Sequence, residues 1–291
     1  MQYNPRHDVM KPHLTRNFFK VCLATLAVGL MAFAGLNTQA AVIVGLSYPS
    51  SGGGENDIFT MDSSAPGLIQ QSHPLSGLQA NETLRGIDFF NGTIFGLGSG
   101  GNLYTVNHNT GAATFVGNFG LVLNGAVFGV DNSPNGFNVV SELRQNLVVN
   151  RATGVATVLP TLTPTAAYVS SLAYSQGTMF AIDSVANVLG TLNTGTGLFS
   201  TIGPLGIDVA RNNGFDIDGQ GIAWLASGAT SSDPQANLYT VNLATGMVTL
   251  VGQVGQPGDN TLVRGLTVIP EPGTASLVLV GLAALAIRRR R

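Results

Sequence analysis

The chain has 291 residues, of which 38 are glycine, one is cysteine and 10% are charged, and its net charge is −2. Between residues 41 and 270, thirteen acidic residues stand against five arginines and no lysine, which gives this region a net charge of about minus eight. Because phosphate binding needs clustered lysine and arginine, this composition excludes a nucleic-acid-binding domain.

Residues 1–40 have the pattern of a Sec-type signal peptide. Arg16 and Lys20 precede the apolar stretch VCLATLAVGLMAFAGL, and small residues end the segment at Ala40. This order predicts export through the Sec translocon and cleavage after Ala40 by signal peptidase; an uncleaved membrane anchor is the alternative. Cleavage would also remove Cys22, the single cysteine, which excludes disulfides, thiolate catalysis and cysteine-based zinc sites from the mature chain.

The middle of the chain, residues 41–269, contains a fourfold repeat. LYTVNHNTGAAT, NLVVNRATGVAT, GTLNTGTGLFST and LYTVNLATGMVT share the pattern Asn-x-x-Thr-Gly followed by a β-branched run. Their glycines, Gly111, Gly154, Gly197 and Gly246, are 43, 43 and 49 residues apart. A period in the low forties with about four short strands per unit is typical of β-propeller blades. The Thr-Gly pair supplies the positive φ that the hairpin needs.

The strand pattern predicts an all-β fold, a single β-propeller with five four-stranded blades. Four complete units begin at RGIDF, FGVDN, SLAYS and GFDID. The strands AVIVGLSY, DIFTMD and LIQQS make up an incomplete first unit, and RGLTVI near the end of the region supplies its fourth strand. Strands from both ends would then close the ring and remove its open edges. Six or seven blades and a non-closed β-solenoid are the alternatives, and helices are expected only in the two terminal segments.

An alignment of the first strands places Asp88, Asp131, Tyr174, Asp216 and Thr267 at one equivalent position, which is expected to line the central channel. Three carboxylates around an axis can supply the acid, the base and the orienting group for glycosidic cleavage. The simpler interpretation is structural, because each aspartate lies just before a turn where its carboxylate can accept backbone N–H groups. Sugar or ion binding is a third interpretation.

Arg85 and Arg264 recur at a second equivalent position, where they would form a salt bridge to a neighbouring blade or contact an acidic sugar. Together with Tyr174 they are the candidate binding residues. Asp216 and Asp218 resemble part of a calcium loop, but the full spacing is missing. The histidines of the region have no metal-ligand spacing. We therefore expect no metal and no cofactor.

The last segment, residues 270–291, contains three elements in order. They are Pro270-Glu271-Pro272, an apolar run at Thr274–Ile287, and the cluster of Arg288, Arg289, Arg290 and Arg291. The run is shorter than the about 20 residues that span a bilayer comfortably. The segment resembles the PEP-CTERM sorting signal of exopolysaccharide-producing Gram-negative bacteria. That resemblance implies processing by an exosortase at the inner membrane and delivery to the cell surface or the extracellular space.

The repeats, with LRGIDF and IFGLGSGGNLYTVNHNTGAATFVG, also resemble a secreted bacterial domain family of unknown function over most of residues 42–269. This resemblance brings no catalytic residues. We expect an exported protein that is transiently anchored in the inner membrane. It would then act as a non-enzymatic structural or binding module associated with exopolysaccharide. The alternative is a glycoside hydrolase or lyase that uses Asp88, Asp131 and Asp216.

Overall fold

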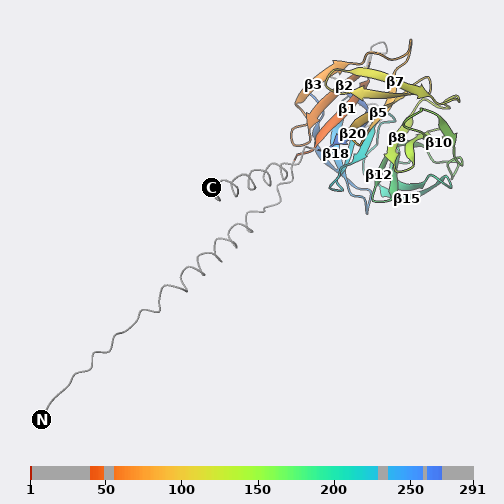
Figure 1. Cartoon of the computed structure of the whole chain (residues 1–291). Helices are drawn as coiled ribbons and strands as arrows, with labels where there is room; N and C mark the ends of the chain where they lie inside the picture. Colours follow the sequence, from red (N-terminus) through yellow and green to blue (C-terminus); the bar gives the residue numbers. More distant parts are fainter. Residues whose placement is uncertain (2–39, 49–55, 229–234, 258–260, 271–291) are drawn as a thin grey trace. The chain divides into compact units, whose positions relative to one another are not determined.

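The computed structural model describes residues 1, 40–48, 56–228, 235–257 and 261–270. In these residues the regular structure is entirely β, with twenty strands in five four-stranded antiparallel sheets. The innermost strand of each sheet lies against the innermost strand of the next sheet, so the sheets form a closed ring (Figure 1). The prediction of a five-bladed β-propeller is confirmed, and the alternatives of six or seven blades or an open solenoid are wrong.

The blades are numbered I to V, and their strands are given from the axis outward. Blade I contains β20 (Leu262–Ile269), β1 (Val42–Tyr48), β2 (Asp57–Asp62) and β3 (Ile69–Pro74). Blade II contains β4 (Leu84–Phe90), β5 (Thr93–Gly98), β6 (Asn102–Asn107) and β7 (Ala112–Asn118). Blade III contains β8 (Phe128–Ser133), β9 (Gly136–Ser141), β10 (Asn146–Val149) and β11 (Ala156–Val158). Blade IV contains β12 (Val169–Ser175), β13 (Thr178–Asp183), β14 (Val188–Asn193) and β15 (Leu198–Pro204). Blade V contains β16 (Gly214–Ile217), β17 (Ala223–Gly228), β18 (Ala236–Val241) and β19 (Val248–Gln253).

Two expected segments fall outside the described residues. They are the signal peptide up to Gln39 and the sorting segment from Glu271 onward, which includes the apolar run and the arginine cluster. Within the part of the chain that is described, no helix is long and apolar enough to cross a membrane.

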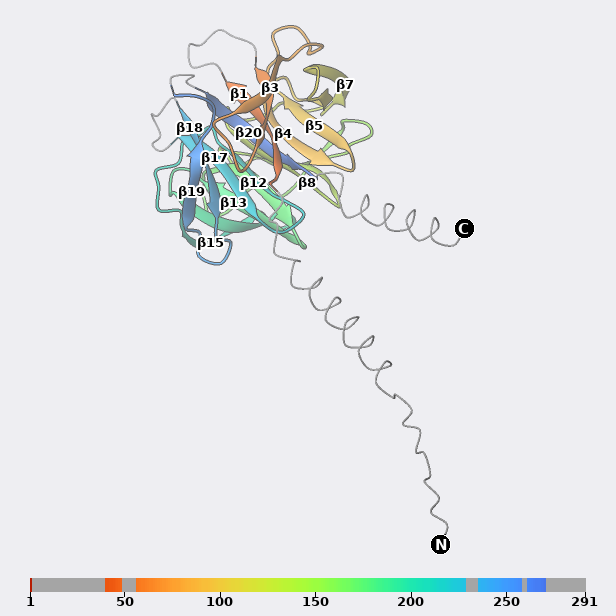
Figure 2. The same cartoon turned by 90° about the vertical axis from the view of Figure 1, so that its left-hand side faces the viewer.

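Blade I is closed by strands from both ends of the domain, as the sequence predicts. β20 lies beside β1 (Figure 2) and pairs with it along its length. Ile269 is the pairing partner of Val42. The first residues after the expected signal-peptide cleavage site therefore lie beside the last residues before Pro270. The closing strand also occupies the innermost position of its blade, next to β4 and β16.

The turns follow the sequence chemistry. Asn91 and Gly92 have φ values of 49° and 85°, which suit a tight two-residue hairpin between β4 and β5. The four repeated Thr-Gly turns also have positive φ at glycine, between 72° and 84°. A side chain would not fit at these glycines, because a Cβ on Gly154 would lie 2.5 Å from the backbone of Gly117 in blade II. The repeated turn thus packs each blade against the rim of the preceding one.

Glycine also sets the spacing of the inner strands. Two residues before the axial position, Gly86, Gly129, Gly214 and Gly265 face the next inner strand. A Cβ on Gly214 would lie 2.5 Å from the backbone nitrogen of Leu266. At Gly129 and Gly214 the inner strands thus approach too closely for a side chain.

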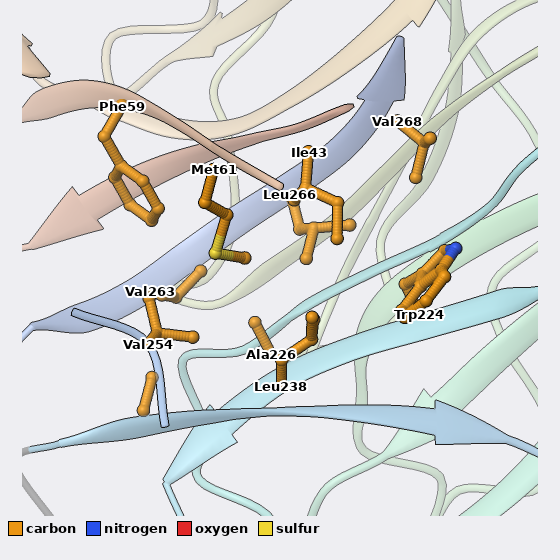
Figure 3. Close-up of a cluster of buried hydrophobic side chains, with 11 residues drawn as sticks. Ile43, Phe59, Met61, Trp224, Ala226, Leu238, Val254, Val263, Leu266 and Val268 are labelled. Carbon is orange, nitrogen blue, oxygen red and sulfur yellow. The ribbon is translucent and has the colours of Figure 1, made fainter. Parts of the chain in front are cut away.

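Apolar side chains fill the space between neighbouring blades. Figure 3 shows the cluster between blades I and V, in which Phe59, Met61 and Leu266 of blade I meet Trp224 and Leu238 of blade V. Comparable clusters lie at other blade junctions. Because burial of each large apolar side chain contributes about 1.5–3 kcal/mol, these interblade layers are the main source of stability.

Candidate functional site

The innermost strands bring a ring of side chains to the propeller axis. In β4 the last hairpin pair is Phe90 with Thr93, and Asp88 lies two residues before it. In β8 Asp131 lies two residues before the corresponding pair. Asp216 of β16 and Thr267 of β20 join them at the axis, where the Thr267 hydroxyl lies 3.0 Å from an oxygen of Asp88 and from one of Asp216. The sequence prediction that residues recurring at this position converge is confirmed for these four.

The expected position of Tyr174 is wrong by one residue. In β12 the last hairpin pair is Ser175 with Thr178, so the axial residue is Ala173, which is fully buried. Tyr174 follows it and its side chain belongs to the other face of the strand. The five axial residues are therefore Asp88, Asp131, Ala173, Asp216 and Thr267.

The three aspartates form one buried group. A carboxylate oxygen from each lies within 4.8 Å of the other two, and the residues are 4%, 4% and 7% exposed. Burial raises the pKa of Asp88. Burial, with repulsion from the neighbouring carboxylates, raises the pKa of Asp131 and Asp216 well above the usual value. The folded protein therefore favours protonation of this group more than the unfolded chain does.

One side-chain oxygen of each axial aspartate and of Thr267 accepts a backbone N–H from the next blade. The N–H of Asn132 donates to Asp88 Oδ2 at 2.8 Å, and the N–H of Tyr174 donates to Asp131 Oδ2 at 2.6 Å. In each case the donor is the residue directly after the axial position of the next blade. These bonds give the aspartates a structural role between blades, whereas the sequence suggested one in local turns.

The pattern continues through blades V and I. The N–H of Val268 donates to Asp216 Oδ2 at 2.7 Å, and the N–H of Phe89 donates to Thr267 Oγ1 at 2.9 Å. The Thr267 hydroxyl also lies 3.0 Å from an oxygen of Asp88 and from one of Asp216. Four of the five blade junctions thus have the same axial hydrogen bond.

The fifth junction, between blades IV and V, has Ala173 in place of an acceptor. The corresponding donor is the N–H of Ile217, and it bonds instead to Oδ1 of Asp216, its own preceding residue, at 2.6 Å. Asp216 therefore uses Oδ2 for the junction with blade I and Oδ1 for an N–H group of its own strand. This accounts for a buried N–H that Ala173 cannot satisfy.

This group has little capacity for catalysis or metal binding. A glycosidase needs two carboxyl groups that reach the substrate, and these carboxylates are buried and each holds a backbone N–H. Calcium takes six to eight oxygens, and although the three carboxylates and the Thr267 hydroxyl carry seven, five of these already accept backbone N–H groups. Asp218, the other part of the calcium-loop resemblance, accepts the N–H groups of Gln220 and Ile222 and the indole N–H of Trp224. Asp218 therefore stabilises the turn between β16 and β17.

Arg85 and Arg264 are equivalent, as the sequence suggests. Each lies three residues before the axial position, at a point where the strand register shifts. Arg85 is half-buried and Arg264 is 7% exposed. Both lie at the start of their strands, away from the end that carries Asp88 and Thr267.

Sequence reasoning missed two grooves at the face where the inner strands end. Groove IV, of about 540 Å³, is lined by Tyr174, Thr178, Thr191 and Asn193 of blade IV and by Ser133 of blade III. Tyr174, a predicted binding residue, thus belongs to this groove and not to the axis.

Groove II, of about 610 Å³, is lined by Phe89, Thr93, Thr105 and Asn107 of blade II and by Ile269 of blade I. Its position in blade II matches that of groove IV in blade IV. A sequence signal existed, because an aromatic residue follows the axial position and a Gly-Thr pair opens the second strand in both blades. This pattern indicates a groove only once the packing of neighbouring blades is known.

The comparisons with known proteins agree with this architecture. The domain of unknown function DUF4394 matches residues 57–267, and the PEP-CTERM protein-sorting motif matches residues 268–291, beginning inside β20. No curated protein matches the chain.

Several solved structures resemble this chain at low sequence identity. A structural genomics protein of unknown function from Bacteroides thetaiotaomicron has 14% identity and a TM-score of 0.51, with 78% of this chain and 64% of that chain covered. A chain of a nidogen/laminin complex has 13% identity and a TM-score of 0.45, with 79% of this chain and 85% of that chain covered. Myxococcus xanthus glutaminyl cyclase has 10% identity and a TM-score of 0.44, with 68% of this chain and 83% of that chain covered. The likeness to the Bacteroides thetaiotaomicron protein, the one of these three with a TM-score above 0.5, concerns the fold alone. By the family match over most of its length, the chain belongs to the DUF4394 family, and it ends in a PEP-CTERM sorting motif.

Proposed function

We propose that this protein is a non-enzymatic binding module, exported and sorted by an exosortase, that acts at the cell surface or in the extracellular matrix and engages exopolysaccharide. The sorting motif supports the route, since it is a signal for exosortase-dependent export. Export through the Sec translocon, cleavage after Ala40 and the domain limits 1–40, 41–269 and 270–291 belong to this proposal.

The observation that carries the non-enzymatic part is the state of the axial carboxylates. Asp88, Asp131 and Asp216 are buried, and each accepts at least one backbone N–H group within the ring. A carboxylate that acts as an acid, a base or a nucleophile must reach the reacting bond. These groups are engaged in holding the blades together, which disfavours the glycoside hydrolase or lyase alternative.

The position of the sorting motif supports a propeller that folds with its closing strand in place. Pro270 directly follows Ile269, whose partner is Val42. Cleavage at or after Pro270-Glu271-Pro272 would leave all twenty strands in the released or attached protein. Processing near this motif is thus compatible with a stable mature domain.

The proposal is tested in the producing bacterium and with the processed protein purified from it. Replacement of Pro270, Glu271 and Pro272 by alanine should leave the protein in the membrane fraction, whereas the parent should be recovered outside the cell or on its surface. The processed parent should be retained by the bacterium's own exopolysaccharide and should release no shorter saccharides on prolonged incubation. Product formation that Asp88→Asn abolishes would overturn the non-enzymatic assignment.

A further inference from the structure

We propose that grooves II and IV are two equivalent binding sites, each for neutral sugar residues of a polysaccharide. This inference rests on the proposed function and names the site at which it operates. It is carried by three features of the grooves, namely their volume, their lining and their repetition in two blades. The axial carboxylates have no part in it.

Groove IV combines an aromatic wall with neutral polar groups. Tyr174 is half-buried, the hydroxyl-bearing Thr178 and Thr191 are partly exposed, and Asn193 lies exposed at the rim. An aromatic ring packs well against the C–H face of a sugar, while hydroxyl and amide groups both donate and accept hydrogen bonds with sugar hydroxyls. The volume of about 540 Å³ lies in the range of small-ligand sites.

Groove II repeats this arrangement position by position. Phe89, like Tyr174, directly follows the axial residue, and Thr93, like Thr178, is the first residue of the second strand. Thr105 and Asn107 occupy the same places on the third strand as Thr191 and Asn193. Asn107 and Asn193 also belong to the repeated Asn-x-x-Thr-Gly turn, where each Oδ1 accepts a backbone N–H. Packing alone does not require threonine at partly exposed positions, so the recurrence of two threonines beside an aromatic residue points to a shared ligand.

The equivalent position in blade III holds a smaller groove of about 400 Å³, whose lining includes Gly136, Val148 and Arg151. Arg151 stacks on the ring of Phe90 at 3.9 Å, and it donates to Asn132 Oδ1 at 3.2 Å and to the carbonyl of Ser133 at 2.9 Å. Gly136 and Val148 stand where the other two grooves have threonine. Blade III therefore has Asn132 in place of the aromatic residue after the axial position and lacks both of the equivalent threonines, so the inference is restricted to blades II and IV.

Charge favours a neutral ligand over an acidic one. The lining of groove IV contains no ionisable side chain other than the Tyr174 phenol. In groove II the one basic group is His108, and burial lowers the pKa of its imidazole, which keeps it uncharged at neutral pH. The surrounding domain is acidic, with thirteen acidic residues against five arginines between residues 41 and 270. An anionic polymer would be repelled by this surface and would find no cation in either groove.

Affinity electrophoresis of the processed protein tests the inference. The gels would contain dextran, galactomannan or xylan as neutral polymers, alginate as an acidic polymer, or the bacterium's own exopolysaccharide. The variants are Tyr174→Ala, Phe89→Ala and the double variant. The matched control is Phe115→Ala, which removes an exposed aromatic ring on β7 outside both grooves. Near-ultraviolet circular dichroism verifies that each variant is folded.

We expect at least one neutral polymer to retard the parent and Phe115→Ala equally. Each single groove variant should bind at least tenfold more weakly at its own site, and the double variant should migrate as it does without polymer. Calorimetry with an oligosaccharide of the retarding polymer should give two sites in the parent and one in each single variant.

Retardation that survives in the folded double variant would overturn the groove assignment and leave the proposed function intact. Binding to alginate alone, lost on Arg85→Ala or Arg264→Ala, would also overturn it in favour of the arginine positions. A parent that no polymer retards, including the bacterium's own, would contradict the proposed function together with the inference.

Discussion

The axis and the groove face of this propeller lie a few residues apart on the same strands, yet they differ in almost every property relevant to a ligand. Asp88 and Asp131 at the axis are ionisable, clustered and buried, whereas Phe89 and Tyr174 beside them line open grooves without carboxylates. The axial oxygens have their partners within the protein, and the groove hydroxyls are partly exposed. A cluster of carboxylates on a propeller axis can therefore be an assembly device, while the surface available to a ligand is neutral.

The largest expected effect comes from removing the closing strand. A chain that ends at residue 260 lacks β20 and with it Thr267 and Val268 of the axial ring. It also loses the layer between blades I and V, including Leu266. Since a domain is stable by only about 5–15 kcal/mol, we expect this chain not to fold. Circular dichroism and gel filtration check this, with a chain ending at Pro272 as the control. A cooperative thermal transition in the shorter chain would show that the ring closes without its axial members.

A single methyl group between inner strands should have the next largest effect. In Gly214→Ala the new Cβ would lie 2.5 Å from the backbone of Leu266, and relief requires the strands to separate. Overpacking of this kind costs about 1–3 kcal/mol, and we expect the upper part of that range because backbone must move. Gly219→Ala in the same blade is the matched control, since a Cβ at Gly219 would have no atom within 4 Å. Chemical denaturation should separate the two variants, and equal midpoints would contradict the close-approach explanation.

The axial carboxylates should make the protein more stable in mild acid. Because the pKa values of Asp131 and Asp216 are raised in the folded state, the folded protein binds more protons than the unfolded chain above pH about 4. Their contribution is therefore most favourable at low pH and declines as the pH rises through the raised pKa values. A tenfold difference in proton affinity corresponds to about 1.4 kcal/mol. Thermal unfolding should show a higher Tm at pH 5 than at pH 8, and the reverse slope would contradict this assignment.

Two substitutions at Asp131 separate its charge from its hydrogen bond. Asp131→Asn keeps an oxygen for the N–H of Tyr174 and removes a charge, so it should flatten the pH dependence at little cost. Asp131→Ala leaves that N–H without an acceptor and should cost about 1–3 kcal/mol. Comparison of their Tm values at pH 8 checks this. Equal destabilisation by both would indicate that the charge itself is required, as a bound cation would imply.

The smallest effect on stability is expected in the grooves. Tyr174 is half-buried and packs against the edge of the cluster between blades III and IV, so Tyr174→Ala should cost only about 1 kcal/mol of unfolding free energy while it weakens polysaccharide binding. Urea denaturation together with affinity electrophoresis measures both quantities. A strongly destabilised Tyr174→Ala would indicate that this ring is part of the core, contrary to its place in groove IV.

The sequence predicted the blades well because the relevant signals are local. Thr-Gly turns, short apolar strands and a constant period are properties of neighbouring residues, and they place the five sheets almost to the residue. The axial aspartates could also be predicted, since they recur at one distance before a hairpin. That Ala173, and not Tyr174, is the axial residue of blade IV could not be predicted. β12 begins with a run that is buried on both faces, so no alternation of apolar and polar residues fixes its register.

The hydrogen bonds between blades and the grooves depend on how the blades are packed. Asp131 bonds to Tyr174, 43 residues away, and no local pattern reports that contact. Likewise, Thr178 and Thr191 become neighbours of Ser133 only after blades III and IV meet. The equivalence of Arg85 and Arg264 could be predicted from the repeated sequence, whereas their role stays a prediction.

Parallel binding and product measurements on Asp131→Asn and Tyr174→Ala test the central claim most directly. Both variants and the parent would be incubated with the polymer that retards the parent, and retention and released saccharides would be measured. If the axis is structural and the grooves bind, Asp131→Asn is retained like the parent, Tyr174→Ala is retained less, and none of the three releases product. Product from the parent that is lost in Asp131→Asn, with Tyr174→Ala unaffected, would place the functional site at the axis and contradict the account.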